Sequence, residues 1–155
     1  MIQRLQSLYL TLITLLSILF FTGNILSFTE KPGSVITVAF NGIFRELNGQ
    51  NSTLIEKLLP LSTIIILIPV ISLITIFIFK NRKVQLKLTG FLIILIVVCI
   101  IALIHVSMSI ISKFEAGIIP GFKMILPVIM LIFSVLAYKG IRKDDQLVKS
   151  YERLR

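Results

Sequence analysis

The chain has 155 residues, of which 56% are hydrophobic and 15% charged, and its formal net charge is +9. Soluble domains average about 45–50% apolar residues, so the composition excludes an ordinary water-soluble protein and indicates an integral membrane protein with a single domain. The cations lie at the ends of apolar runs rather than along one face, which argues against a nucleic-acid-binding protein.

Four apolar runs predict membrane-spanning segments at residues 8–28, 58–79, 88–112 and 121–138. We expect each of them to be a helix, because lipid offers no hydrogen-bond partner to an unpaired backbone group. The first run is longer than the apolar core of a secretory signal, and no small-residue cleavage site follows it, so we expect it to be retained. Its Ser7, Thr11 and Thr14 share one helix face. These hydroxyls either bond across to other helices or bond their own backbone.

The connection at residues 29–57 contains a β-hairpin signal, Asn41-Gly42, between two apolar stretches. Strands are expected at residues 34–40 and 43–47. We expect their apolar face to rest on the helix ends or the lipid interface; it carries Ile36, Phe40, Ile43 and Leu47. The expected register pairs Phe40 with Ile43, Val38 with Arg45, and Ile36 with Leu47. The fold class that follows is an all-α membrane protein, a four-helix transmembrane bundle with a small extracytoplasmic β-hairpin between the first two helices.

The third run is the longest and carries the only cysteine, Cys99, and the only histidine, His105. Six residues separate them, which places them about 120° apart around a helix, so they do not form a metal site. We expect His105 to make a polar contact inside the membrane, as a hydrogen bond to another helix. Handling of a proton or substrate is the alternative role for His105. No catalytic, cofactor-binding or metal-binding residue is predicted.

The tail at residues 139–155 is expected to form a cytoplasmic basic amphipathic helix, with Asp144 or Asp145 capping its start. It binds either the lipid surface or a partner protein, and both readings stay open. The candidate contact residues are Arg142, Lys143, Lys149, Tyr151, Arg153, Leu154 and Arg155.

The distribution of cations predicts the orientation in the membrane. The start of the chain, the connection after the second run and the tail together carry eleven Lys and Arg residues, whereas the other two connections carry five. The positive-inside rule therefore predicts that both termini are cytoplasmic and that the hairpin lies outside.

The two ends of the chain resemble a known family. The opening Met1-Ile2-Gln3-Arg4-Leu5-Gln6 with Tyr9-Leu10, and the closing Ile141-Arg142-Lys143-Asp144-Asp145 with Leu147-Val148-Lys149-Ser150 and Arg153-Leu154-Arg155, are similar to a Bacteroidota family of small four-span membrane proteins. This is domain-of-unknown-function family 4293. Asp145 and Glu152 stand where the family pattern has Glu and Asp. The resemblance implies a bacterial inner membrane and carries no activity with it.

The spans offer little chemistry, since all seven carboxylates lie outside the apolar runs. We therefore expect a non-catalytic inner-membrane protein, a structural or accessory subunit of a membrane complex. The alternative is a component of a small-solute or lipid transporter or channel. Such a component would need a hydrated cleft, for which the available side chains are Thr11, Thr14, Ser72, Thr75 and His105. The expected partners are membrane lipid and, through the tail, another membrane or cytoplasmic protein, with no nucleic acid and no cofactor. The oligomeric state is left open.

Overall fold

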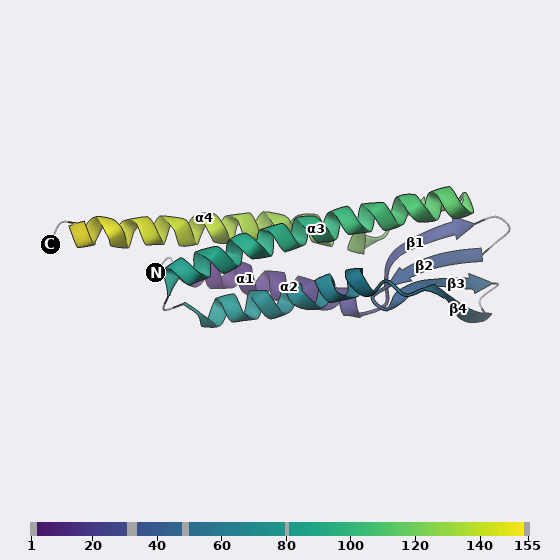
Figure 1. Ribbon diagram of the computed structural model, residues 1–155, viewed down its shortest axis with the longest axis horizontal. Coiled ribbons are helices and arrows are strands. Elements are labelled where there is room, and N and C mark those ends of the chain that lie inside the picture. The colour runs from purple at the N-terminus through teal and green to yellow at the C-terminus, as the bar shows by residue number, and fades with distance from the viewer. Residues whose placement is uncertain (1–2, 31–33, 48–49, 80, 154–155) are drawn as a thin grey trace.

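The structure, a computed structural model, describes residues 3–30, 34–47, 50–79 and 81–153, except the side chains at 3–4, 47, 50–52 and 148–153. The described residues form four α-helices that run side by side, with strands gathered at one end of the molecule (Figure 1). The helices are α1 (Gln3–Ile18), α2 (Leu59–Phe77), α3 (Arg82–Phe114) and α4 (Leu126–Arg153). Helices α1 and α3 each contact both α2 and α4. Both chain ends lie away from the strands (Figure 1).

Three helices in the described part of the chain are long and apolar enough to cross a membrane, which indicates a membrane protein. They are α2, α3 and the segment Phe122–Leu147, which contains most of α4. The first apolar helix, Leu5–Phe21, is shorter than these three. The prediction of a bundle of four membrane-spanning helices is therefore wrong, because the first run stops being helical well before residue 28.

The prediction of an all-α protein with one small hairpin is also wrong, because the strands form a five-stranded antiparallel sheet in the order β4-β3-β2-β1-β5. Only β2 (Ser34–Ala39) and β3 (Gly42–Leu47) correspond to the expected hairpin. The other strands are β1 (Asn24–Glu30), β4 (Gln50–Glu56) and β5 (Gly117–Ile119). β5 follows α3, so residues 88 positions apart in the chain come together, as in the pair Thr29 and Gly117.

The change from helix to strand occurs at Gly23. After α1 the chain makes a short 3₁₀ turn, η1 (Leu19–Phe21), and Gly23 then adopts a left-handed φ of +62°, a conformation that glycine adopts without steric cost. The next apolar side chains, Ile25, Leu26 and Phe28, are buried. Mean hydropathy does not distinguish these strand residues from the end of a helix, which is why the first span was predicted to be too long.

The hairpin forms with its turn one position earlier than expected. Ala39 pairs with Gly42 and Val38 with Ile43, so Phe40 and Asn41 form the turn. The hydroxyl of Ser62, in the first turns of α2, donates to the Phe40 carbonyl over 2.6 Å, and the Phe40 ring lies 4.9 Å from that of Phe21. These contacts hold Phe40 at the helix ends. The shift moves each pairing by two residues and therefore keeps Ile36 and Ile43 on one face, as expected.

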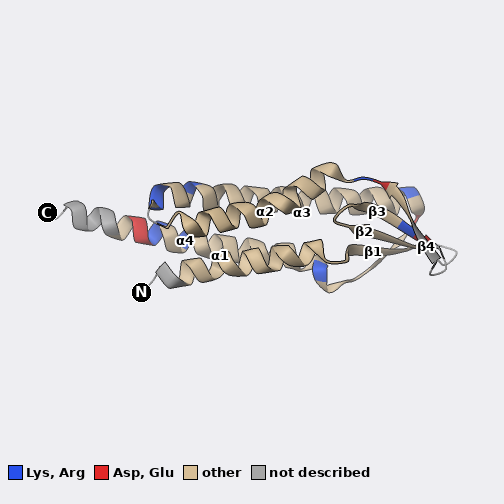
Figure 2. Cartoon of the chain, turned by 90° about the horizontal axis from the view of Figure 1, so that it is seen from below, with Lys and Arg blue, Asp and Glu red and all other residues tan. Residues whose placement is uncertain are grey.

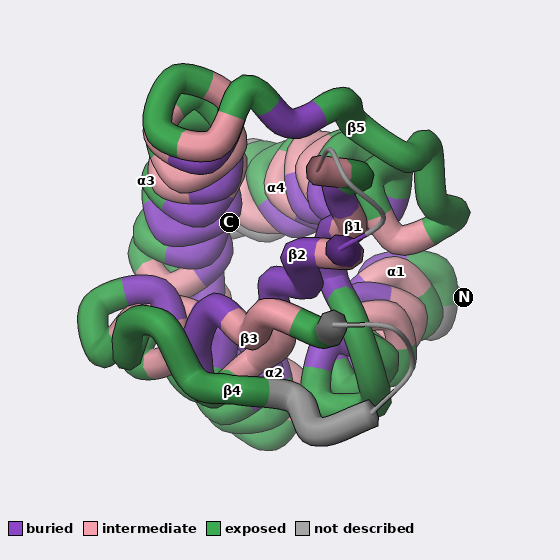
Figure 3. Tube along the Cα trace, turned by 90° about the vertical axis from the view of Figure 1, so that its right-hand side faces the viewer, coloured by how far each residue is buried: buried purple, intermediate pink, exposed green. Residues whose placement is uncertain are grey.

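The sheet turns an apolar face inward, and its buried residues belong to the same core as those of the helices (Figure 3). At its far end this face becomes polar. Glu30 of β1 accepts a hydrogen bond from Ser34 and an ion pair from Arg45, both over 2.7 Å. The Arg45 guanidinium also lies 5.9 Å from the centre of the Phe114 ring, at the end of α3. α3 extends past the ends of α1 and α2 and lies along the sheet (Figure 1).

We expect Gly42→Ala to lower the free energy of unfolding by about 1–3 kcal/mol, the cost of a strained backbone position. Gly42 has a φ of +155°, and an added Cβ would lie 2.4 Å from the Glu56 carbonyl oxygen. Gly121→Ala is the matched control, because its Cβ would meet nothing within 4 Å. Denaturant unfolding in detergent micelles measures both variants. Equal stabilities for the two variants would contradict this account of the β3–β4 contact.

Candidate functional site

The first and last helices are joined by a buried hydrogen bond at the end of the molecule opposite the sheet. Gln6 in α1 donates from Nε2 to Oδ2 of Asp144 in α4 over 2.7 Å. Gln6 is only 5% exposed and Asp144 only 7%. Arg82 in α3 donates from its guanidinium to the Asp144 backbone carbonyl over 2.9 Å. A buried carboxylate left without donors is costly, so these contacts stabilise the arrangement of three helices.

The same region includes the fourth helix. Gln85 of α3 donates from Nε2 to the backbone carbonyl of Thr75 in α2 over 3.3 Å, and both side chains are buried. A cavity of about 20 Å³ lies between Gln6, Arg82, Gln85 and Asp144, which is room for about one water molecule. We call Gln6, Arg82, Gln85 and Asp144 the polar cluster.

Gly140 lets α4 approach α1 closely at the polar cluster. A Cβ at position 140 would lie 2.9 Å from Cγ of Gln6. Gly140 and Asp144 are four residues apart, so they lie on the same face of α4. Gly140 therefore leaves room for the Gln6 side chain, and the Asp144 carboxylate accepts its hydrogen bond.

The polar cluster was not predicted, although the sequence contained a signal for it. Gln6 and Asp144 each belong to one of the two terminal motifs that carry the family resemblance, and the fold brings those motifs together across 138 residues. Chemically, the cluster contains amide, guanidinium and carboxylate groups and no nucleophile. Among the described residues, no group of three or more His, Cys, Asp or Glu side chains is placed to hold a metal ion.

Cys99 and His105 lie on different faces of α3, as their spacing predicts. Cys99 is buried in the core, whereas His105 is exposed. Within the described part of the chain, no hydrogen bond joins His105 to another helix, so its role in a polar contact stays a prediction.

Most of the hydroxyl groups that were considered for a hydrated cleft are buried, and they form hydrogen bonds with other groups of the protein. Thr14 of α1 donates to Ser72 of α2 over 3.1 Å, and Ser72 donates to the Leu10 carbonyl over 2.9 Å. Thr14 and Ser72 are buried, as is Thr75, which bonds the backbone of its own helix. Thr11 is exposed and also bonds its own backbone, through the Leu8 carbonyl. Of the two readings for these hydroxyls, Thr11 follows the local one, whereas Thr14 is compatible with both, because its hydroxyl also lies 3.0 Å from the Leu10 carbonyl of its own helix.

The basic tail is a continuation of α4, which runs unbroken to Arg153. No helix begins at Asp144 or Asp145, so neither residue acts as a cap. Arg142 and Lys143 are exposed on this helix. Lys149, Tyr151 and Arg153 belong to its backbone, but their side chains lie outside the described part of the structure, as do the residues Leu154 and Arg155 altogether.

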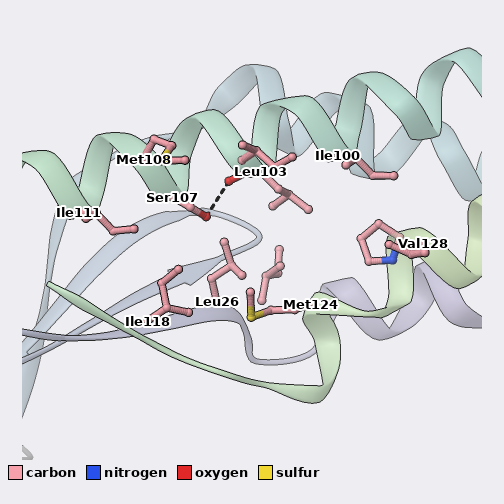
Figure 4. A pocket seen from close by; sticks show the side chains of 12 residues that line it. Leu26, Ile100, Leu103, Ser107, Met108, Ile111, Ile118, Met124 and Val128 are labelled. Atoms are coloured by element: carbon pink, nitrogen blue, oxygen red, sulfur yellow. Dashed lines mark hydrogen bonds between the residues drawn. The ribbon is translucent and has the colours of Figure 1, made fainter.

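An apolar cavity of about 280 Å³ lies where the helices meet the sheet (Figure 4). Its walls come from α3, β1, β5 and the start of α4. This cavity was not predicted from the sequence, because its walls come from segments that lie far apart in the chain and were predicted as separate spans and loops.

We expect Gln6→Ala to lower the free energy of unfolding by about 1.5–3 kcal/mol, the range for a hydrogen bond to a charged group. Gln146→Ala is the control, since Gln146 is an exposed glutamine on α4 and should change stability by less than about 0.5 kcal/mol. A double-mutant cycle with Asp144→Ala, followed by denaturant unfolding in micelles, isolates the pair. Strictly additive effects would show that the Gln6–Asp144 contact contributes nothing.

Comparison with known proteins places the chain in a family. A search of the curated proteins finds no match. A family model described as "Domain of unknown function (DUF4293)" matches residues 2–154. The match covers almost the whole chain, including Gln6 and Asp144, and the chain therefore belongs to the DUF4293 family.

Proposed function

We propose that this protein is a non-catalytic structural or accessory subunit of a complex in the bacterial inner membrane. The observation that carries the proposal is the shape of α4, which continues beyond the ends of the other helices as a straight projection (Figure 1). A helix that only anchors a chain in lipid needs no such extension. A projecting cationic helix offers a surface to a second molecule.

The orientation follows from the charges. Figure 2 shows Lys and Arg residues toward both ends of the molecule. Among the residues whose side chains are described, the sheet side has four, Arg45, Lys57, Lys113 and Lys123, whereas the end opposite the sheet has six, Arg82, Lys83, Lys87, Lys139, Arg142 and Lys143. By the positive-inside rule this end is cytoplasmic. α1 begins and α4 ends on the side of the molecule away from the sheet (Figure 1). The chain would thus be a multi-pass protein with both termini in the cytoplasm and the sheet on the opposite side.

The tail contacts a protein rather than the lipid surface in this proposal. A helix that binds the interface lies in the membrane plane, whereas the tail continues the axis of α4, which crosses the membrane. The exposed Arg142 and Lys143 begin the charged part of this projection. Membrane lipid remains the partner of the apolar helix surfaces.

The packing between α1 and α2 argues against a solute path. A transport route needs hydrated polar groups, but Thr14 and Ser72 bond each other in the buried core. A gap nearby, bounded by Ser17, Ile65 and Cys99, is too small to hold a water molecule. This arrangement favours a structural role over a solute channel.

Cysteine labelling tests the orientation. In a Cys99→Ala background we expect Asn41→Cys, at the exposed hairpin turn, to react with an impermeant reagent added to spheroplasts. Gln146→Cys, exposed on α4, should react only after permeabilisation. Labelling of both positions from the same side would refute the proposed orientation.

Partner capture tests the role of the tail. We expect at least one specific protein to co-purify after in-cell cross-linking with the full chain. The same protein should be lost when the chain is truncated after Leu147, and also when residues 148–155 are shuffled with charge and amphipathicity preserved. Truncation after Leu147 retains Asp144 and hence the Gln6 contact, so loss of the partner does not reflect loss of the fold. An unchanged set of partners in all three forms would contradict docking through the tail.

A further inference from the structure

The last strand of the sheet has an unpaired edge. β5 stands at the end of the strand order and, among the described residues, pairs with β1 alone. All three of its residues are exposed. An edge strand presents backbone N–H and C=O groups with which another chain can pair. An open sheet edge is not found facing hydrocarbon, where those groups would have no partner.

The pairing register shows which residue of β5 faces this edge. Ala39 and Gly42 close a two-residue turn and therefore form a hydrogen-bonded pair, and such pairs alternate with non-bonded pairs along a ladder. Ile36 stands three positions before Ala39, so its backbone groups face β1 and bond to Phe28. Phe28 then directs its groups away from β5, which makes Phe28 and Ile118 a non-bonded pair. The N–H and C=O of Ile118 therefore point to the open edge.

The side chain of Ile118 lines the apolar cavity of about 280 Å³. Figure 4 shows side chains of α3 facing Ile118 and Met124 across the open space. Among the residues that line the cavity, the one hydroxyl group is that of Ser107, which already donates to the Leu103 carbonyl over 2.8 Å. The walls thus offer nothing that would orient a polar solute. A cavity of about 150 Å³ holds benzene, so this one has room for a large apolar side chain.

Contacts between the helices show which residues lie at the same depth. α2 and α3 are antiparallel, and Gln85 of α3 bonds to Thr75 of α2. The same number of residues along each helix leads from this contact to Pro60, in the first turn of α2, and to Ile100. On α4, Val128 lies opposite Ile100 in the wall of the cavity (Figure 4). Both α2 and α4 therefore begin level with this part of α3.

Cations mark that level as a boundary of the hydrocarbon layer. Lys57 lies just before α2 and Lys123 just before α4. On α3, Lys83 and Leu103 are separated by about 30 Å of helix, which is the thickness of a hydrocarbon core. α3 continues from there to Phe114, about 16 Å further. This last part of α3 and the sheet therefore lie on the aqueous side of the boundary, where lipid tails do not cover the cavity.

A second copy of this chain does not supply a strand for this edge. Copies in one membrane share an orientation, so the axis of a two-fold dimer lies along the membrane normal, and the strands run in that direction too (Figure 1). Rotation about such an axis keeps β5 parallel to its copy and places Ile118 opposite the same residue. A parallel ladder instead needs slanted bonds between residues at different heights. The added strand therefore belongs to a different protein.

We propose that β5 and the cavity beside it bind an extended segment of a partner protein on the sheet side of the membrane. The segment adds a sixth strand at the open edge and places one apolar side chain in the cavity. Backbone hydrogen bonds with Ile118 provide affinity, and the cavity selects the side chain, as in other cases of strand addition. This surface adds a second contact to the proposed subunit and does not depend on what the tail binds or on which side is cytoplasmic.

Cysteine labelling in nanodiscs tests the depth, and both faces of the membrane are accessible there. In a Cys99→Ala background we expect Met108→Cys to react with an impermeant maleimide and Ile94→Cys to remain unlabelled. The two positions are matched, since Met108 is 64% and Ile94 61% exposed on α3, and only the second lies within the hydrocarbon layer. Equal labelling or protection of both would refute the placement. Disulfide-linked dimers of Met108→Cys would reveal a second copy at this surface and would refute the choice of partner.

Peptide selection tests the binding mode. The probe is an mRNA-display library of random nine-residue peptides, depleted on empty nanodiscs and selected on the full chain in nanodiscs. We expect the enriched peptides to alternate apolar and polar residues, because one face of the added strand meets the cavity and the other meets water. N-methylation of the central peptide bonds should weaken binding about fivefold for each hydrogen bond lost. Enrichment of helical patterns, or no enrichment, would contradict strand addition.

Two pairs of variants locate the site. Ile118→Pro removes the donor at the open edge, a place where proline is tolerated, and should weaken binding about fivefold, whereas Ile118→Val keeps the donor and should bind normally. Ser107→Phe fills the cavity and should weaken binding about tenfold, the factor for about two methylene groups excluded. Ser112→Phe, exposed on α3 outside the cavity, should have no effect. Binding that survives both Ile118→Pro and Ser107→Phe would overturn the proposal, and the N-methylated peptides decide it if these variants fail to fold.

Discussion

The length of α3 relative to the helices beside it determines how the rest of the chain is arranged. α3 has 33 residues, whereas α1 has 16 and α2 has 19. The part of α3 beyond their ends still has apolar side chains that need cover, and the sheet lies against it (Figure 1). A sheet satisfies its own inner backbone groups, so it can lie next to a lipid-facing helix without burying unpaired ones. The cavity is the space that remains where the neighbouring helices end and the sheet begins to cover α3.

At the other end of α3, directional contacts fix how the helices face one another. Apolar helix surfaces in lipid slide and rotate against each other at little cost, because lipid tails are as apolar as the side chains. The hydrogen bonds of Gln6, Arg82 and Gln85 each join two different helices. Each bond is worth only a modest free energy, but together they allow one rotational setting for each helix. The chain thus combines a specific polar contact at the end opposite the sheet with a less directional apolar core.

Hydropathy and charge predicted the positions of α2 and α3 and the presence of the β2–β3 hairpin, because long apolar runs and an Asn-Gly pair are strong local signals. The sheet could not be predicted in full, since β1 consists of apolar residues that follow an apolar helix, and β5 pairs with β1 only through the tertiary fold. The hairpin register changed because Ser62 and Phe21 hold Phe40 in the turn. The polar cluster depends on a contact between the two ends of the chain, which no local pattern contains.

The continuity of α4 has a mechanical consequence. Its first turn borders the cavity, and its last turns form the tail, with no proline after Pro127 to act as a joint. A helix of 28 residues is a rod about 42 Å long, so a tilt of about 5° moves one end by roughly 4 Å relative to the other. Gly140 and Asp144 against Gln6 provide a pivot nearer the tail than the cavity. A displacement of α4 beside the cavity would therefore also move its far end, on the side of the molecule opposite the sheet.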